Sequence, residues 1–451
     1  MLLLPHFIIL WILSDKTYLE LYRNSSAGGL SVCLRILLVF LYIVTLCLLH
    51  IMPCMSRKEG RTLPFRIRIM YGGRRILKFC FWGIFAQFFI YLLKLPAYVA
   101  ADESWPLVMI VDGIFMFFHF CLLVLNGYVR ILCTCRSLGV WKRILLAFFL
   151  WIPVFHLLPA RYLMKRAYEE YDAERCRFEN RLSRPVGACA TRYPLILLHG
   201  IGFRDLRYFN YWGRIPKELV RNGAVVYYGH QEAWGTIEEN AGIIRGKIEE
   251  ILREAHCEKV NIIAHSKGGL DARYMIRAMH MEDKVASLTT ISTPHKGSEL
   301  LNILNKLPDG IYRSVSSLFD WTYARFGDSN PDCYHASKQL SPDFCMEFNR
   351  KYPDSPKVYY QSYASCVKHT LGDGLLSIPN LLMFLAGASR NDGLVTTESA
   401  KWGNFRKTFV SAGRRGISHG DMIDLKREDY KGFDVVEAYV EIVAELKGMG
   451  F

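Results

Sequence analysis

The sequence predicts an α/β domain with a mostly parallel central sheet, preceded by a helical membrane region. In the second half of the chain, short β-branched runs alternate with amphipathic patterns, as in Ile237–Ala255 followed by Val260–Ile263. The first part instead contains apolar segments long enough to cross a bilayer. We therefore expect a membrane domain at 1–160, a charged helical connector at 161–190 and the α/β domain at 191–451, with helices on both faces of its sheet.

Four apolar segments near the N-terminus predict about four transmembrane helices, because the first three approach the ~20 residues that a spanning helix needs and the fourth is only somewhat shorter. They are residues 32–52, 76–98, 106–127 and 144–160. Pro153 and Pro159 leave two interpretations open for the last segment, a kinked span or an interfacial helix. Buried helices of a soluble domain are the alternative, which the repetition of such segments disfavours. A shorter apolar stretch, Leu2 to Leu13, lacks the features of a signal peptide and is interpreted as an interfacial or extra anchor.

The charge distribution follows the same division of the chain. Residues 1–160 contain 16 Lys and Arg against 6 Asp and Glu, whereas the remainder contains 40 against 36, so the net charge of +14 is concentrated in the apolar part. This pattern is typical of membrane topology, and no basic cluster interleaved with aromatic residues indicates nucleic-acid binding. The basic residues between the first two expected spans are Arg57, Lys58, Arg61, Arg66, Arg68, Arg74 and Arg75.

These basic residues, and others after the third segment, place both loops in the cytoplasm. If the fourth segment spans the bilayer, the α/β domain faces outward. If it only dips into the bilayer, the domain stays in the cytoplasm. We expect an integral protein of the cell membrane, with the outward side slightly favoured and both sides left open.

The stretch from Asn261 to Gly269 carries the strongest chemical signal. An apolar strand pattern stops at Ala264-His265-Ser266-Lys267-Gly268, and a helical pattern begins after Gly269. A serine at the apex of a strand, a sharp turn and a helix is typical of a nucleophile elbow, in which close backbone segments require small residues two before and two after the serine. Ala264 in place of glycine is a mild departure. A βα turn that happens to contain a serine is the alternative at this stage.

An earlier apolar strand, Tyr193–Leu198, ends in His199-Gly200-Ile201-Gly202. A glycine-containing turn after such a strand can supply one backbone N–H group of an oxyanion hole. We assign the two oxyanion donors to the amides of Ile201 and Lys267. A phosphate-binding loop is disfavoured because neither G-x-x-x-x-G-K-[ST] nor G-x-G-x-x-G is present here.

Several further motifs occur in order along the chain. They are Leu-Leu-His-Gly-Ile-Gly-Phe (197–203), Tyr211-Trp212-x-x-Ile215-Pro216, Asn222-Gly223-Ala224-x-Val226-Tyr227, the elbow with its strand (259–266), Val285-Ala286-Ser287, Thr293-Pro294-His295-Lys296-Gly297-Ser298 and Asn391-Asp392-Gly393-Leu394-Val395. Together these segments resemble bacterial triacylglycerol lipases of the Pseudomonas/Burkholderia type, within the α/β-hydrolase superfamily. The resemblance covers about 193–425, roughly half of the chain. It implies an α/β-hydrolase fold that follows the N-terminal membrane domain.

The α/β-hydrolase order requires an acid and then a histidine after the serine. Asp392 follows an apolar run, Leu381 to Ala386, that we expect to be a strand. Asn-Asp-Gly alone is more often a plain turn, but the resemblance implies that Asp392 is the catalytic acid. His419, in Ser-His-Gly-Asp, lies downstream as the order demands, whereas the earlier histidines are expected to be structural. The predicted catalytic residues are thus Ser266, Asp392 and His419.

The resemblance also implies a structural calcium ion beside the histidine. Asp421, two residues after His419, occupies one ligand position, and Asp373 is the nearest acid for the other. Two solvated acids on loops are the alternative. The chemistry itself requires no cofactor, and the 13 cysteines show no metal-binding spacing.

Two other segments complete the prediction. Residues 299–345 contain apolar patches and resemble the insert that carries a lid helix in these lipases, although any core helix has such a face. Phe433–Lys447 predicts a packing helix at the C-terminal end. The whole sequence indicates a membrane-anchored serine hydrolase that acts on ester bonds of lipids at a bilayer. An acyltransferase or thioesterase with the same triad, and an inactive membrane scaffold, are the alternatives.

Overall fold

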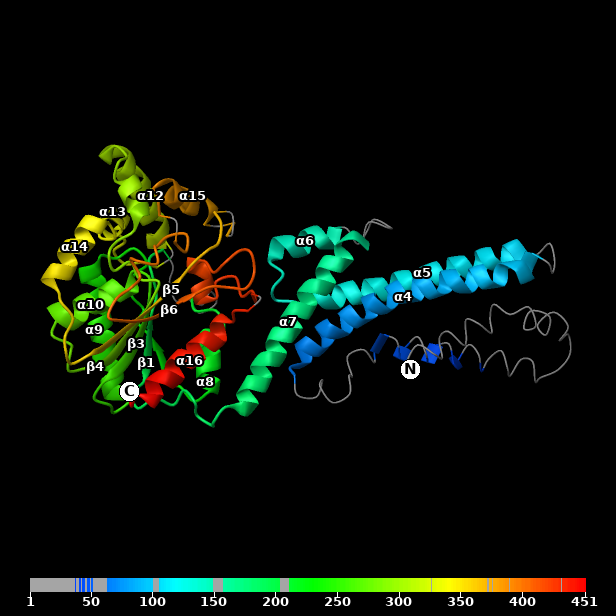
Figure 1. The fold of residues 1–451 in the computed structure, drawn as a ribbon, viewed down its shortest axis with the longest axis horizontal. Helices are drawn as coiled ribbons and strands as arrows, with labels where there is room; N and C mark the ends of the chain where they lie inside the picture. Colours follow the sequence, from blue (N-terminus) through cyan, green and yellow to red (C-terminus); the bar gives the residue numbers. More distant parts are fainter. Residues whose placement is uncertain are drawn as a thin grey trace. The chain divides into compact units, whose positions relative to one another are not determined.

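The computed structural model describes residues 63–99, 105–148, 157–202 and 211–451 except 326, 371, 372, 375, 389 and 431, together with scattered positions between 37 and 51. The chain divides into two compact units, Met1–Glu179 and Asn180–Phe451. The ribbon in Figure 1 shows long helices in the first unit and a sheet flanked by helices in the second.

The N-terminal unit is built on two long helices, α4 (Phe65–Val99) and α5 (Trp105–Thr134), followed by α6 (Val140–Phe148) and by α7, which starts at Leu157. Helices α4 and α5 lie side by side (Figure 1). They approach closely at two glycines, because a Cβ atom on Gly73 would lie 2.7 Å from the carbonyl oxygen of Gly127. Small residues of this kind allow two helix backbones to approach closely.

Two helices among the described residues are long and apolar enough to cross a membrane, at Phe65–Leu93 and Phe117–Thr134, fewer than the four expected. The expected span at 32–52 lies outside the described residues apart from scattered positions, as does the stretch Leu2 to Leu13. The described ends of the expected span at 144–160 belong to two separate helices, α6 and α7, and neither of them passes this test.

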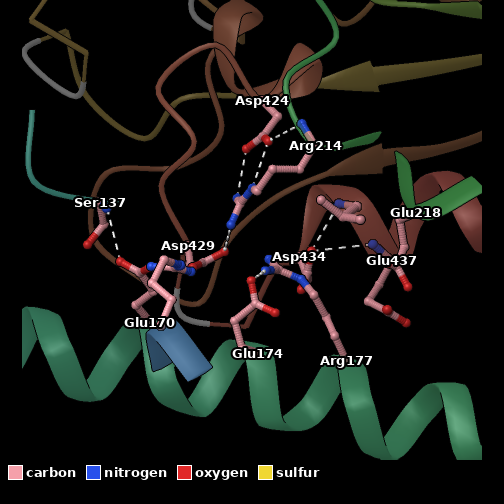
Figure 2. Close-up of polar contacts among 12 residues, drawn as sticks. Ser137, Glu170, Glu174, Arg177, Arg214, Glu218, Asp424, Asp429, Asp434 and Glu437 are labelled. Atoms are coloured by element: carbon pink, nitrogen blue, oxygen red, sulfur yellow. Dashed lines mark hydrogen bonds and ion pairs between the residues drawn. The ribbon is translucent and has the colours of Figure 1, made fainter. Parts of the chain in front are cut away.

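The expected basic loop after the first span is wrong in its second half. Arg66, Arg68, Arg74 and Arg75 lie inside α4, which begins eleven residues before the expected span at 76–98. Arginine is a good helix former, so the helix continues beyond its apolar part, and hydropathy alone underestimates its length. One of these arginines, Arg66, pairs with the buried carboxylate of Glu170 on α7, which also accepts a hydrogen bond of 3.0 Å from the Ser137 amide (Figure 2).

The second unit is organised around a six-stranded sheet in which every paired strand is parallel, with the order β2-β1-β3-β4-β5-β6. The strands are β1 (Leu195–Leu198), β2 (Val226–Tyr228), β3 (Val260–His265), β4 (Val285–Ile291), β5 (Tyr359–Ser365) and β6 (Asn404–Phe409). The order reverses between β1 and β3, and in open parallel sheets ligands bind at such a switch point, beyond the carboxyl ends of the strands.

Helices cover both faces of this sheet, as expected. Alternate residues of β1 point to different cores: Leu195 and Leu197 pack with the residues of α8 (Ile215–Arg221) and α16 (Val435–Gly448), whereas Ile196 and Leu198 pack with those of α9 (Ile237–Glu254) and α10 (Gly268–Ala278). Figure 1 shows the same two layers. This is the two-residue period of a strand buried on both faces.

The remaining elements connect the later strands. Between β4 and β5 lie α11 (Glu299–Leu304), α12 (Asp309–Arg325), α13 (Cys333–Lys338) and α14 (Pro342–Lys351). Between β5 and β6 lies α15 (Ser377–Leu385), and the short 3-10 helix η3 (His419–Ile423) follows β6. The connector helix α7 ends at Ser183.

The expectation of a strand at Leu381 to Ala386 is wrong, because these residues belong to α15 and the turn after it. A short apolar run has no periodicity that separates a strand from a helix. Pro379 in the first turn and the exposed side chains of Leu381 and Phe384 fit the helix.

Candidate active site

The turn that carries Ser266 has the geometry of a nucleophile elbow. Strand β3 ends at His265, α10 begins at Gly268, and Ser266 between them has a φ of 55°. A non-glycine residue in this left-handed region is strained, and such strain persists only where the surrounding structure enforces it.

Glycine is required on the C-terminal side of Ser266. A Cβ atom on Gly268 would lie 2.4 Å from the carbonyl oxygen of His199, and one on Gly269 would lie 2.3 Å from the Thr293 hydroxyl oxygen. On the other side, Ala264 is fully buried in the sheet core without strain at its own backbone. The departure from glycine noted at position 264 is therefore accommodated.

The turn after β1 packs directly on Ser266. A Cβ atom on Gly200 would lie 2.7 Å from the Cβ of Ser266, so only glycine permits this approach. The backbone amides of Ile201 and Lys267, the two expected oxyanion donors, make no hydrogen bond with the residues that the structure describes. Both are available to a negatively charged oxygen near Ser266.

The carboxylate of Asp392 and the imidazole of His419 form a buried pair, with 2.9 Å between Oδ2 and Nδ1. The same Oδ2 accepts a hydrogen bond of 3.2 Å from the Ser365 hydroxyl, and Oδ1 accepts from the amides of Leu394 and Val395. Burial opposes ionisation of this carboxyl group, but the interactions with His419 and the two backbone amides together hold the pKa of Asp392 below its usual value. The carboxylate is thus ionised and fixes one nitrogen of His419 as a donor.

His419 lies beside the elbow, because its ring centroid is 4.4 Å from that of His265, the residue before Ser266. The hydroxyl of Ser266 makes no hydrogen bond with any residue of the described part of the chain. Catalytic hydrogen bonds often form only when substrate binds, so the missing Ser266–His419 hydrogen bond does not count against His419 as the base.

A tyrosine connects the two turns at the site. The amide of Gly200 donates a hydrogen bond of 2.9 Å to the Tyr211 hydroxyl, which lies 2.7 Å from Nδ1 of His265. Burial, together with the nearby charge of His419, lowers the pKa of His265 well below its ordinary value. His265 is therefore neutral, and its Nδ1 shares a hydrogen bond with the Tyr211 hydroxyl.

A buried ion pair lies under the second oxyanion donor. Lys267 Nζ is 2.7 Å from Asp271 Oδ1, and both side chains are 1% exposed. The other carboxylate oxygen of Asp271 accepts a hydrogen bond of 3.2 Å from Asn240, which also binds the backbone of Glu232. The residue after Glu232, Ala233, accepts a hydrogen bond of 3.0 Å from the Gly202 amide. This polar chain therefore joins the Lys267 turn to the Ile201 turn.

The carboxylates of Asp373 and Asp421, the expected calcium ligands, do come together next to His419. Their oxygens are occupied by protein donors, chiefly Arg415. Among the described residues, no cluster of three or more His, Cys, Asp or Glu side chains could hold a metal ion. The donor set therefore does not fit calcium.

The chain is similar in sequence to proteins of known function. A family model described as a PGAP1-like alpha/beta domain matches residues 233–320. The triacylglycerol lipase of Vibrio cholerae serotype O1 is 30% identical over 244 residues, which make up 48% of this chain and 76% of that protein. The chain belongs to the triacylglycerol lipase family of α/β-hydrolases.

Two further triacylglycerol lipases are similar to this chain. Triacylglycerol lipase 2 of Saccharomyces cerevisiae is 29% identical over 268 residues, which cover 55% of this chain and 77% of that protein. The triacylglycerol lipase of Pseudomonas fragi is 28% identical over 296 residues, or 58% of this chain and 98% of that protein. The expected fold class and the expected class of enzyme, an ester hydrolase, are confirmed.

Four side chains near the site were not predicted from the sequence. Tyr211 stood inside a recognised motif without a role, and Asp271 was detectable from its i,i+4 spacing to Lys267. Ser365, which donates to Asp392, is contributed by the end of β5, and only the sheet order reveals this. Arg415 had no local signal, because its partners lie 42 residues before it and 6 residues after it.

Proposed function

We propose that this chain is a membrane-anchored serine hydrolase that cleaves ester bonds of lipids through Ser266, His419 and Asp392. The observation that carries the proposal is the buried Asp392–His419 pair beside a serine held at a positive φ. In an ordinary βα turn, no functional constraint would maintain a strained serine next to a histidine that a carboxylate orients.

In the proposed reaction, the Ser266 hydroxyl oxygen attacks the ester carbonyl while Nε2 of His419 takes its proton. Asp392 accepts the Nδ1–H hydrogen bond of His419 and stabilises the imidazolium. The amides of Ile201 and Lys267 bind the oxyanion of the tetrahedral intermediate. His419 then returns the proton to the leaving alcohol, and a water molecule hydrolyses the acyl-enzyme by the same steps.

The surface of the second unit favours a lipid substrate. Helix α12 leaves Ile311, Val315, Leu318 and Trp321 between 48% and 62% exposed, while Tyr312 and Ser316 on the opposite face are buried. This spacing gives an apolar stripe that faces outward. A second apolar helix, α15, has four exposed large side chains, Ile378, Leu381, Phe384 and Leu385. Exposed apolar faces of this extent are typical of surfaces that meet a membrane or another apolar partner.

Membrane anchoring is supported by the first unit. Large aromatic side chains on α4 remain more than half exposed, namely Phe81, Trp82, Phe85, Phe88 and Phe89. Lipid tails would cover such a helix, whereas a helix in the core of a soluble domain buries these side chains within the protein.

A fluorophosphonate probe tests the proposal, because such reagents label only an activated serine. We expect the wild-type protein to be labelled and Ser266→Ala to lose both labelling and hydrolysis of p-nitrophenyl esters, by ~10⁴-fold or more. Ser183→Ala is the control, since the exposed hydroxyl of Ser183 at the end of α7 donates only to the Asn180 carbonyl oxygen and its loss should leave Ser266 reactive.

Unchanged hydrolysis by Ser266→Ala would contradict the assignment of the nucleophile. Labelling without hydrolysis of any ester would instead indicate an acyltransferase or a thioesterase. A wild-type protein that is not labelled would indicate an inactive scaffold.

A further inference from the structure

The loop that carries His419 contains an arginine between the two carboxylates at which the family resemblance places calcium. Arg415 Nη1 lies 2.7 Å from Asp421 Oδ2, and Nη2 lies 3.1 Å from Asp421 Oδ1. The same Nη2 is 2.9 Å from Asp373 Oδ2. One guanidinium group thus binds Asp421 with both of its terminal nitrogens and bridges to Asp373, a geometry that lysine cannot reproduce.

The other hydrogen-bonding positions of the two carboxylates are also occupied. Asp373 Oδ2 accepts a hydrogen bond of 2.5 Å from the Ser418 hydroxyl, and Lys426 pairs with Oδ1. Asp421 accepts 2.8 Å from the Ser418 amide on Oδ2 and 2.6 Å from the Tyr430 hydroxyl on Oδ1. Both carboxylates are nearly buried, at 3% and 2% exposure for their residues.

These contacts leave no place for a calcium ion. Calcium takes six to eight oxygen ligands at about 2.3–2.6 Å, whereas each carboxylate oxygen here faces N–H or O–H donors. Two cationic side chains, Arg415 and Lys426, already balance the two carboxylates. A divalent ion would therefore have to displace Arg415 and place additional positive charge beside Lys426.

The arginine is connected to the proposed catalytic base by a short path. Asp421, fixed by Arg415, accepts the amide of Ser418 and so closes the turn in which His419 lies. The amide of His419 in turn donates 2.9 Å to the backbone oxygen of Asp392. Displacing Asp421 would consequently move the His419 backbone relative to its carboxylate partner.

We propose that Arg415 is a positioning residue that replaces a structural calcium ion, so that this hydrolase holds its catalytic histidine without a divalent cation. The inference rests on the proposed role of His419. The expected change in unfolding midpoint does not rest on that role, because Arg415 holds the turn whether or not His419 is catalytic.

The first experiment compares the full-length wild-type protein in excess EDTA and in millimolar CaCl₂. We expect the same thermal unfolding midpoint and the same ester hydrolysis in both solutions. A midpoint or kcat that falls in EDTA and returns with calcium would overturn the proposal.

The second experiment uses Arg415→Ala, which leaves two buried carboxylates without their bridging cation. We expect a lower unfolding midpoint and a kcat reduced ~10–100-fold with little change in KM, because the histidine is misplaced while the substrate surface is intact. Calcium should partly restore both quantities in this variant, and magnesium should do so less well, since it demands a stricter geometry. Arg415→Lys, which keeps the charge but not the fork, should lie between wild type and Arg415→Ala.

An Arg415→Ala protein with wild-type kcat and midpoint would contradict the positioning role. If Arg415→Ala does not fold without calcium, recovery of folded protein in CaCl₂ supports the proposal, and failure of both calcium and Arg415→Lys to recover it contradicts it. Failure of the proposed function is recognised separately, by hydrolysis that survives Ser266→Ala.

Discussion

The turn that carries Ser266 and the loop that carries His419 meet in one site, but different interactions hold them in place. Ser266 lies between a fully buried strand and a helix, with glycine backbones in contact around it. His419 lies in a short 3-10 helix outside the sheet, fixed by ion pairs and hydrogen bonds. Packing is dense and tolerates little change, whereas a buried charge network depends on each partner being present.

A second set of ion pairs lies at the C-terminal end of η3, the helix that carries His419. Arg214 donates to both carboxylate oxygens of Asp424 at 2.7 Å and pairs with Asp429 at 2.9 Å (Figure 2). Asp424, which ends η3 in the left-handed conformation, also packs against Gly213. The histidine helix therefore has an arginine at each end, and we expect it to respond to charge changes while the serine turn responds to changes in volume.

Asp392→Asn should produce the largest effect on activity of the variants in this comparison. The amide keeps the shape of the carboxylate but favours the wrong tautomer of His419, so kcat should fall by ~10⁴-fold. The unfolding midpoint should change little by comparison with this loss. Steady-state kinetics with a soluble ester measure the effect, and a loss below tenfold would show that Asp392 does not orient the base.

Arg214→Met should cost about 3–5 kcal/mol of unfolding free energy, because it leaves the buried Asp424 carboxylate without its main partner. Urea denaturation measures this cost. The double variant Arg214→Met/Asp424→Asn is the control, since it also removes the unpaired charge and should recover part of the loss. Equal stability of the single and the double variant would argue against charge as the force that holds this loop.

Gly268→Ala tests the backbone packing around Ser266. The added methyl group would lie 2.4 Å from a backbone oxygen, so the elbow must shift, at a cost of about 1–3 kcal/mol. Activity should fall with stability, because the Lys267 amide moves with the turn. Gly246→Ala, in the middle of α9 with no atom of another segment within 4 Å of the new Cβ, should instead be neutral or stabilising.

Mild acid should produce the smallest effect. Burial and nearby positive charges lower the pKa values of His265 and His295 well below the ordinary value of 6.5, so the unfolded chain binds protons that the folded protein does not. The contribution of these two histidines to stability is therefore fully present well above pH 6.5 and decreases as the pH falls through it. Burial raises the pKa of Asp271 to about 6, which acts in the opposite sense around and below that pH.

Between pH 7.5 and 6, we consequently expect a net loss of about 1 kcal/mol in unfolding free energy. Urea denaturation at several pH values measures it. His295→Gln should reduce the slope, and stability that rises over this interval would contradict the assignment of neutral buried histidines.

The densely packed elements around Ser266 were predicted more accurately from the sequence than the loop that carries His419. The starts of β3 and α9 were predicted to the residue, because apolar periodicity is a local signal, although β3 continues two residues beyond the expected end at Ile263. The elbow was predictable for the same reason. Its glycines meet atoms of distant segments, but the need for small residues is visible in the motif itself.

The histidine loop was less predictable, because its interactions join residues far apart in the chain. Asp421 was chosen through the resemblance, whereas nothing in the local sequence indicated that Arg415 would lie between it and Asp373. In the N-terminal unit, hydropathy located the apolar part of α4 but not its start, since arginines support a helix as well as a loop.

Among the described residues, helix α12 contacts the oxyanion side through its C-terminal end, whereas Asp309 at its N-terminal end accepts hydrogen bonds from Tyr334 and Lys338 of α13. The Tyr323 hydroxyl donates to the carbonyl oxygen of Gly202, and Asp328 just beyond the helix accepts the amides of Ala233 and Trp234. A movement of α12 that keeps these C-terminal bonds is a pivot about this end, and it must break the bonds that join Asp309 to α13.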